Sequence, residues 1–442
     1  MVQTEGLDAV FEQLERIGAT AIALSPYVAE VVPKDQGKRV PDLHVDGYRR
    51  LLARPAFGQR EQVLHFHLAY TPNLAHYQNT PYRSQRAPLT EGLDQNVPYA
   101  MIAEAKRRGL ECYLQIHPLI PSDVRPEHQP VYPDGSVPQA PQVSLYGNPT
   151  QDLIRAYALA LVQDTLEHFP MLDGLFVDWL EYGAYNLKDL FSSLDPASAD
   201  RAHFLGYNWS HITHEVTALW RDLHHLEEAE LKNHPEHLAA LFATCDGWQQ
   251  LCAFKADIIT GLYREIRDMM DQLSHRDMHL MARGWPPPWN HMSGLWYEKL
   301  IDIVSVATPK LFAFDYMALP RWYAETLQAW NPQVSETSLL DAVIHWLELN
   351  DSKTKRRFND YYIPTVDEPQ PLGVTAYQQR IKTVQNTLSG KLKVQPFAHA
   401  HMPDSMWKAM LTMLEKTATD GFWVQMYGYL GENKLAMMAG QS

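Results

Sequence analysis

The segment from Asp173 to Tyr182 contains the residues whose types and spacing point most directly to chemistry. An apolar run with the composition of a buried parallel strand ends in Asp178, Trp179 and Glu181. In a β/α barrel, side chains that follow the carboxyl end of a strand lie at the face where catalysis takes place. Paired carboxylates flanked by aromatic rings are what hydrolysis of a glycosidic bond requires. The segment therefore predicts a barrel enzyme that acts on a sugar-like substrate.

Asp178 is the first candidate for catalysis, because a carboxylate that ends an apolar strand is costly to desolvate without a task or a partner. The alternative is an aspartate that caps a loop or pairs with an arginine. Glu181 is expected to be the acid/base, a ligand for sugar hydroxyls or a carboxylate at a helix start. A third carboxylate, Asp315, follows the apolar run Leu311–Phe314 and could come from another strand. That arrangement suits the roughly 5 to 10 Å that separates the two carboxyl groups of glycosidases. Asp315 could also be a turn residue, and Glu368 is a weaker candidate.

Several polar and aromatic residues at or after expected strand ends are candidates for substrate binding. A flat ring can pack on the C–H face of a sugar while polar neighbours hold its hydroxyl groups. Core packing is the alternative for each ring taken singly. The candidates are His117, Trp179, Trp285, Trp289, His399, Gln425 and Tyr427.

Two other functions are possible: a barrel that binds carbohydrate without catalysis, its acids only binding hydroxyl groups, and a metal-dependent hydrolase. His399 and His401 are two residues apart in an expected strand and can point to one face, where His117 and Asp178 could join them. However, no His-x-His begins the expected first strand, where metal-dependent amidohydrolases usually carry it. We therefore predict neither a metal nor a cofactor.

The order of elements predicts an α/β fold, a (β/α)8 TIM barrel with helical insertions. Eight strand candidates lie near residues 20, 63, 111, 174, 279, 303, 393 and 421, and most alternate with helices. The chain contains no glycine-rich phosphate loop, which argues against a nucleotide-binding sheet. No helix separates the run Val63–Tyr70 from the first strand, so this run could instead be a hairpin on the barrel rim. The first barrel strand would then lie upstream of Met1 or come from irregular N-terminal chain.

We expect residues 1–442 to form a single decorated barrel. Residues 185–278 are predicted to be a helical insertion, with a long amphipathic helix near Phe254–Leu273. Residues 320–390 are predicted to be a second helical insertion.

Composition narrows the function classes. The 442 residues are 45% hydrophobic, which is ample for a large core. The net charge of -14 and the lack of a long basic run exclude nucleic acid as an expected partner. No apolar run reaches membrane-spanning length and no secretory leader is recognised. Cys112, Cys245 and Cys252 lack metal-binding spacing and are read as free thiols in a reducing compartment. The expectation is a cytoplasmic protein with a small-molecule carbohydrate substrate and no predicted oligomeric state.

Three segments together resemble a group of bacterial β/α barrels related to the α-amylase and family-10-like glycoside hydrolases. They are Ala105–His117, Asp173–Tyr182 and Trp423–Leu430. The resemblance implies a barrel fold, a nucleophilic Asp178 at the end of the fourth strand, an acid/base from a late strand such as Asp315, and a strand-end His117 that binds sugar hydroxyls. The helical segment 185–278 and the lack of an export signal depart from that pattern.

Overall fold

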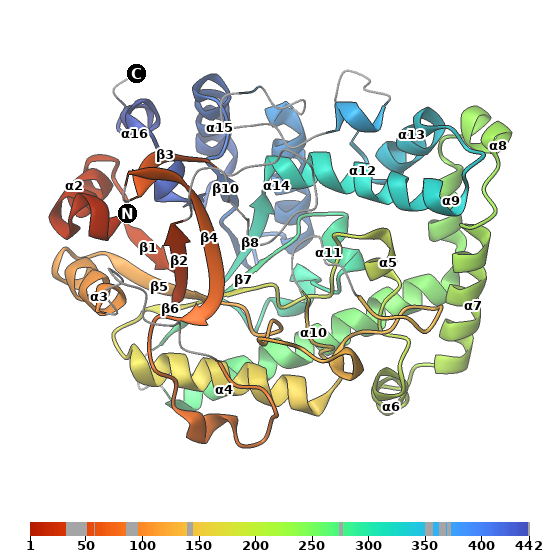
Figure 1. Cartoon of the computed structure of the whole chain (residues 1–442), viewed down its shortest axis with the longest axis horizontal. Helices are drawn as coiled ribbons and strands as arrows, with labels where there is room; N and C mark the ends of the chain where they lie inside the picture. Colours follow the sequence, from red (N-terminus) through yellow and green to blue (C-terminus); the bar gives the residue numbers. More distant parts are fainter. Residues whose placement is uncertain are drawn as a thin grey trace.

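A computed structural model describes residues 1–31, 51–56, 58–84, 96–138, 145–273, 277–349, 357–361, 368 and 373–440. Its main sheet has eight strands, and every pair within it is parallel. The strand order is β1-β5-β6-β7-β8-β10-β11, and β9 also pairs with β8. The sheet curls into a half-barrel with helices packed around it (Figure 1), which confirms the predicted α/β fold of TIM-barrel type. The strands are β1 (Ala21–Leu24), β5 (Glu111–Ile116), β6 (Gly174–Asp178), β7 (His279–Gly284), β8 (Val306–Leu311), β9 (Lys393–Val394), β10 (Phe397–His399) and β11 (Trp423–Gln425).

The run near residue 63 is not part of this sheet, which corrects one of the eight strand predictions. It forms β4 (Gln59–Leu68), which lies between β2 (Tyr27–Val31) and β3 (Leu51–Ala56) in an antiparallel three-stranded sheet. Parallel neighbours need a crossover segment, usually a helix, whereas antiparallel strands can follow one another through a short turn. The absence of a helix between the first strand and this run therefore pointed to the alternative of a hairpin on the barrel rim.

Helices lie outside the sheet and in the two insertions. Those that alternate with strands are α2 (Leu7–Arg16), α3 (Val97–Arg107), α4 (Asp152–His168), α10 (Asp246–Leu273), α14 (Val374–Leu388) and α15 (Asp404–Thr417), with α16 (Glu432–Met438) after the last strand. The segment 185–278 adds α5 (Leu187–Leu190), α6 (Pro196–Phe204), α7 (Trp209–Asp222), α8 (Glu228–Asn233) and α9 (His237–Thr244). Shorter helices are α1 (Val2–Glu5), α11 (Trp289–Met292), η1 (Leu74–Tyr77), η2 (Pro126–His128), η3 (Tyr297–Leu300), η4 (Phe358–Asp360) and η5 (Tyr427–Tyr429).

The second insertion begins earlier than expected. Helix α12 spans Ala313–Trp330 and is followed by α13 (Glu336–Trp346). Strand β8 therefore ends at Leu311, and the predicted extension of the strand to Phe314 is wrong. In α12, Met317, Leu319 and Tyr323 are fully buried, so helical packing takes over from strand pairing directly after Phe312.

The interior of the curled sheet is layered. Rings from four strands form a lower layer, in which Phe176 lies 4.7 Å from Trp423 and 5.8 Å from Phe397, and Tyr113 lies 5.4 Å from Trp423. Because side chains of a strand alternate between its two faces, the next inward residues lie one layer nearer the carboxyl ends of the strands. These next residues are polar: Gln115, Asp178, His399 and Gln425. An aromatic floor therefore supports a polar layer.

Side chains bridge the two ends of the curled sheet. Among the described residues, no hydrogen-bonded pairing joins β11 to β1. Arg54 on β3 donates two hydrogen bonds to Glu5, at 2.9 and 2.7 Å, and pairs with Glu432 at the start of α16. The Tyr427 hydroxyl donates to Glu5 at 2.9 Å, and the Arg54 guanidinium lies 5.1 Å from the Tyr427 ring centroid. We call Glu5, Arg54, Tyr427 and Glu432 the seam cluster.

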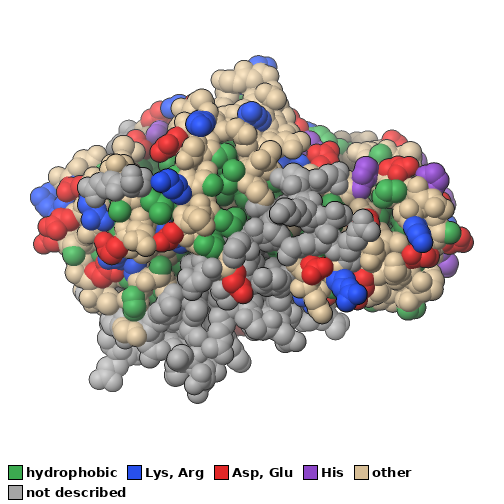
Figure 2. All heavy atoms as spheres, turned by 90° about the horizontal axis from the view of Figure 1, so that it is seen from above, with side chains coloured by type: hydrophobic (Ala, Val, Ile, Leu, Met, Phe, Trp, Pro, Cys, Tyr) green, Lys and Arg blue, Asp and Glu red, His purple; other side chains and the backbone are tan. Residues whose placement is uncertain are grey.

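The described part of the chain contains no helix that is both long enough and apolar enough to cross a lipid bilayer. Figure 2 shows acidic and basic side chains interspersed over the described part of one face of the molecule.

Candidate active site

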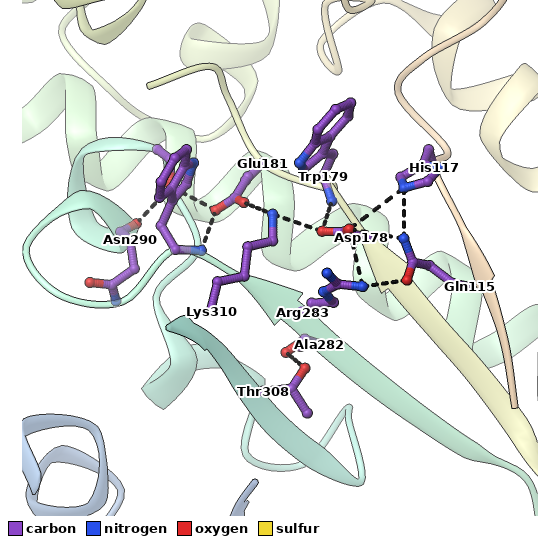
Figure 3. A network of polar contacts seen from close by, with 12 residues as sticks. Gln115, His117, Asp178, Trp179, Glu181, Ala282, Arg283, Asn290, Thr308 and Lys310 are labelled. Atoms are coloured by element: carbon purple, nitrogen blue, oxygen red, sulfur yellow. Dashed lines mark hydrogen bonds and ion pairs between the residues drawn. The ribbon is translucent and has the colours of Figure 1, made fainter. Parts of the chain in front are cut away.

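Three charged residues from neighbouring strands meet in the polar layer (Figure 3). Asp178 is the last residue of β6, and its Cα is paired with that of Arg283 on β7. Lys310 comes from β8, which pairs with β7. All three side chains are at most 5% exposed. Parallel register places Asp178, Arg283 and Thr308 at one level, and the side chain of Lys310, two residues beyond Thr308, also reaches Asp178 in this buried interior.

Asp178 is surrounded by donors and cations. Lys310 Nζ lies 2.8 Å from Oδ1, and Arg283 Nη1 lies 3.5 Å from Oδ2. The backbone N–H of Trp179 donates to Oδ1 at 3.0 Å, and Gln115 Nε2 donates to Oδ2 at 3.2 Å. Burial alone would raise the pKa of this carboxyl group, but the Arg283 and Lys310 charges outweigh it and hold the pKa well below its usual range. Asp178 therefore stays ionised.

Glu181 has the opposite ionisation behaviour. Its Oε2 accepts hydrogen bonds from the Trp285 backbone N–H at 3.2 Å and from Ser293 Oγ at 3.0 Å. Its Oε1 lies 3.7 Å from Lys310 Nζ, a distance too long for a hydrogen bond. Burial is the largest influence and raises the pKa of Glu181 to about 7. Glu181 can therefore hold a proton near neutral pH.

The backbone between the two carboxylates explains how residues only three apart share one ammonium group. Trp179 has φ 57°, in the left-handed region that bulky residues rarely adopt. Gly284 is needed on the other side of Glu181. A Cβ at position 284 would lie 2.8 Å from Glu181 Oε2 and 2.0 Å from Leu295 Cδ2. A tight turn and a missing side chain therefore seat Glu181 beside Asp178.

Lys310 occupies the centre of the site. Its ammonium group lies 5.7 Å from the Trp179 ring centroid and 5.6 Å from that of Trp285. No described residue accepts a hydrogen bond of normal geometry from Nζ, so its close contacts are the ion pairs with the two carboxylates. Lys310 therefore acts on both carboxylates through its charge.

Lys310, Arg283 and Gln115 were not predicted from the sequence, although a signal was present for the two charged residues. Lys310 and Arg283 each interrupt a strongly apolar strand. A charge inside such a run must be paired, because its burial is otherwise too costly. Arg283 is also hydrogen-bonded to Gln115 and Gln425, and its guanidinium lies 3.7 Å from the Phe397 ring centroid.

Of the residues predicted from sequence, His117, Trp179, Trp285 and Gln425 lie at the site with the two carboxylates. His117 Nε2 lies 3.0 Å from Gln115 Nε2 and 3.5 Å from Asp178 Oδ2, and burial lowers the pKa of the imidazole. Its ring stacks on Tyr27, with centroids 5.0 Å apart. Gln425 reaches the site through Arg283.

The remaining predicted residues are placed differently. Trp289 is fully buried behind Trp285, with ring centroids 6.1 Å apart. His399 packs against Phe312 and Tyr429, and Tyr427 belongs to the seam cluster. Asp315 is in the first turn of α12, and its side chain lies outside the described residues.

Within the described ranges, no group of three or more His, Cys, Asp or Glu side chains is arranged to hold a metal ion. The alternative site built on His117, His399 and His401 therefore receives no support from the described side chains.

Comparison with known proteins gives distant likenesses only. No family model matches the chain, and no curated protein matches it in sequence. Two similar solved structures are β-galactosidases from Marinomonas ef1 and Halorubrum lacusprofundi, each 11% identical, with TM-scores of 0.46 and 0.47. The match covers 80% of this chain but 52% and 51% of theirs, so the chain spans about half their length. The catalytic domain of a Paenibacillus polymyxa β-amylase is 10% identical, with a TM-score of 0.43 and coverage of 78% and 83%. These likenesses are too distant to assign an activity.

Proposed function

We propose that the protein hydrolyses a glycosidic bond. One observation carries the proposal: two buried carboxylates, Asp178 and Glu181, lie around one ammonium group and are driven to opposite ionisation states. Pairs of titratable groups whose pKa values are pushed apart divide into a base and an acid. An ionised carboxylate beside a protonated one is the pair that glycoside hydrolysis uses.

The roles follow from the ionisation states. Glu181 donates its proton to the departing glycosidic oxygen, and Asp178 stabilises the positive charge that develops on the anomeric carbon or bonds to it. Water then supplies the hydroxyl group of the released sugar, and the deprotonated Glu181 accepts the proton that the water loses. Lys310 and Arg283 hold Asp178 in the ionised form. We favour Glu181 over Asp315 as the acid, because the carboxyl group of Glu181 lies near Lys310, the partner of Asp178. The side chain of Asp315 lies outside the described residues.

The substrate class is supported by the rings around the carboxylates. Trp179 and Trp285 flank Lys310, and the Tyr185 ring lies 4.9 Å from that of Trp285. Aromatic faces beside hydrogen-bonding groups suit the alternating C–H and hydroxyl surfaces of a carbohydrate.

The test is hydrolysis of a panel of 4-nitrophenyl α- and β-glycosides, followed by point variants on the best substrate. Asp178→Asn keeps the size but removes the charge, and we expect a loss on the order of 10³-fold in kcat. Glu181→Gln should cost little in kcat/KM with the 4-nitrophenolate leaving group and far more with a sugar leaving group, which needs the proton. Asp173→Asn is the matched control, because Asp173 precedes the opposite end of β6, where it pairs with Lys106. It should leave turnover unchanged.

One observation favours a binding protein without catalysis. Lys310 and Arg283 already neutralise Asp178, as in a purely structural ion network. If no glycoside of the panel is cleaved, and sugars bind equally to the wild type and to Asp178→Asn, this second function replaces the first.

A further inference from the structure

A groove lies between the segment of α5 and helix α12. It has a volume of about 300 Å³. Helix α12 begins directly after β8, the strand that carries Lys310, and α5 follows the loop that carries Glu181. The groove is lined by Lys188, Trp322, Glu325, Thr326, Ala329 and Trp330.

One tyrosine connects the groove to the carboxylates. The Tyr185 ring lies 4.9 Å from Trp285 and 6.3 Å from Trp179, both of which flank Lys310. On its other side it lies 6.5 Å from Trp322, which lines the groove. A row of rings therefore runs from the ionised and protonated carboxylates into the groove.

The groove wall is held in place before any ligand binds. The Trp330 ring stacks on His224, with centroids 4.0 Å apart and planes inclined by 21°, and lies 4.8 Å from Trp220. Glu325 accepts a hydrogen bond from Arg321 at 2.6 Å. Side chains that are already ordered lose less conformational entropy when a ligand binds.

The chemistry of the wall selects a neutral, hydroxyl-rich ligand. Two indole rings line the groove with apolar surface, while Lys188, Glu325 and Thr326 line it with polar groups. The opposite charges of Lys188 and Glu325 favour neither a polyanion nor a polycation.

We propose that the groove is a distal sugar subsite, and that the substrate is a neutral oligosaccharide rather than a single glycoside. One end of the oligosaccharide lies at Asp178 and Glu181. Its more distant sugar units lie first along Tyr185 and Trp322 and then along Trp330. The proposal rests on the proposed function and names its substrate class.

Binding is the test, because it does not need turnover. Titration calorimetry is run on the full chain carrying Asp178→Asn, with cello-, malto- and β-galacto-oligosaccharides of two to six units. In one of these series the affinity should rise with length. Lys188→Ala and Trp330→Phe, each added to Asp178→Asn, should reduce the affinity for four to six units by about tenfold, comparable to the loss of one good aromatic contact. Neither substitution should change the affinity for oligosaccharides of two units.

Lys408→Ala on α15 is the control for removal of an exposed lysine and should change nothing. A thermal melt of each variant separates loss of binding from loss of fold. Affinity that is independent of length, equal losses at every length, or no binding in any series overturns the subsite. If 4-nitrophenyl glycosides are cleaved but length has no effect, only the subsite fails. If binding depends on length but nothing is cleaved, only the proposed catalysis fails.

Discussion

Asp178 and Glu181 carry the same chemical group in one short segment, yet their surroundings drive them to opposite ionisation states. The difference lies in the partners. Asp178 contacts Lys310 and Arg283 and accepts hydrogen bonds on both oxygens. Glu181 accepts hydrogen bonds on one oxygen, and the ammonium group of Lys310 lies 3.7 Å from the other. Desolvation favours the neutral form of a carboxyl group and nearby cations favour the ionised form. Small differences in placement around one lysine therefore divide the roles of acid and base.

These pKa shifts predict the pH dependence of catalysis. If Glu181 must be protonated, kcat/KM should fall as the pH rises through about 7, the pKa of its carboxyl group. On the acid side the rate should stay level below pH 4, the ordinary range for an aspartate, because the pKa of Asp178 is held lower. The measurement is a profile of kcat/KM from pH 3 to pH 9 on an oligosaccharide or other glycoside with a poor leaving group.

Two variants check which group causes the alkaline decline. Glu181→Gln cannot lose a proton and should abolish the decline along with most of the rate. Lys310→Met removes a charge that lowers the pKa of Glu181, so the decline should move to higher pH. A decline at the same pH in the Gln variant would assign it to another group.

At the level of residues, the sequence was most informative where a strand ends. Asp178, Glu181 and His117 could be found because polar side chains follow apolar runs. Lys310 and Arg283 were not found, because their function depends on which carboxylate faces them across neighbouring strands. That pairing is set by sheet register, which no local pattern contains.

At the level of elements, Gly284 tests how tightly β7 approaches the loop that carries Glu181. Gly284→Ala places a methyl group within 2.0 Å of Leu295 and 2.8 Å of Glu181. We expect a loss of about 1–3 kcal/mol of stability from overpacking. A displaced Glu181 should also lower kcat for substrates that need its proton. Urea unfolding and steady-state kinetics measure the two effects.

Gly261→Ala is the matched control, since position 261 lies inside α10 and a new Cβ there would meet only Arg155 Nη2, at 3.8 Å. Alanine in a helix interior should leave stability equal or slightly higher. If Gly284→Ala behaves like this control, the loop around Glu181 can yield, and the close packing does not position the acid.

Element boundaries show what local pattern can and cannot supply. Helix α10 covers the predicted amphipathic segment Phe254–Leu273 and ends at the predicted residue, because an amphipathic pattern indicates a helix that packs on one face. The β8 boundary was misplaced, since the apolar run Leu311–Phe314 continues past the end of the strand at Leu311 into the start of α12. An apolar run of this kind does not distinguish a strand from a buried helix.

At the level of the whole molecule, alternation of strands and helices predicted the parallel sheet but not how its ends meet. The aromatic floor and the polar layer follow from strand alternation once the sheet has curled. The ends are joined instead by α1, β3 and the residues after β11, through the seam cluster. Contacts between Glu5 and Tyr427 connect the two termini of the chain, and such distant pairs leave no periodic signal in the sequence.

The seam cluster makes a prediction about global stability. Arg54 is only 15% exposed and bonds to both carboxylates, so Arg54→Ala leaves Glu5 partly buried without its main cation. We expect a loss of about 1–2 kcal/mol, between the values for exposed and buried ion pairs. Arg54→Lys should recover part of it, because an ammonium group keeps the charge but not the two-pronged geometry. The readout is the urea midpoint at low and high salt.

Arg107→Ala is the control, because the Arg107–Glu104 pair links an exposed arginine, 64% accessible, to a neighbouring turn of the same helix. The urea midpoint of Arg107→Ala should be almost the same as that of the wild type. Because the seam cluster and the Asp178 site are built from different side chains, kcat/KM at 25 °C should be the same in Arg54→Ala and the wild type. A midpoint for Arg54→Ala equal to that of Arg107→Ala would mean that strand pairing and core packing alone hold the curled sheet, with the polar seam contributing nothing to its stability.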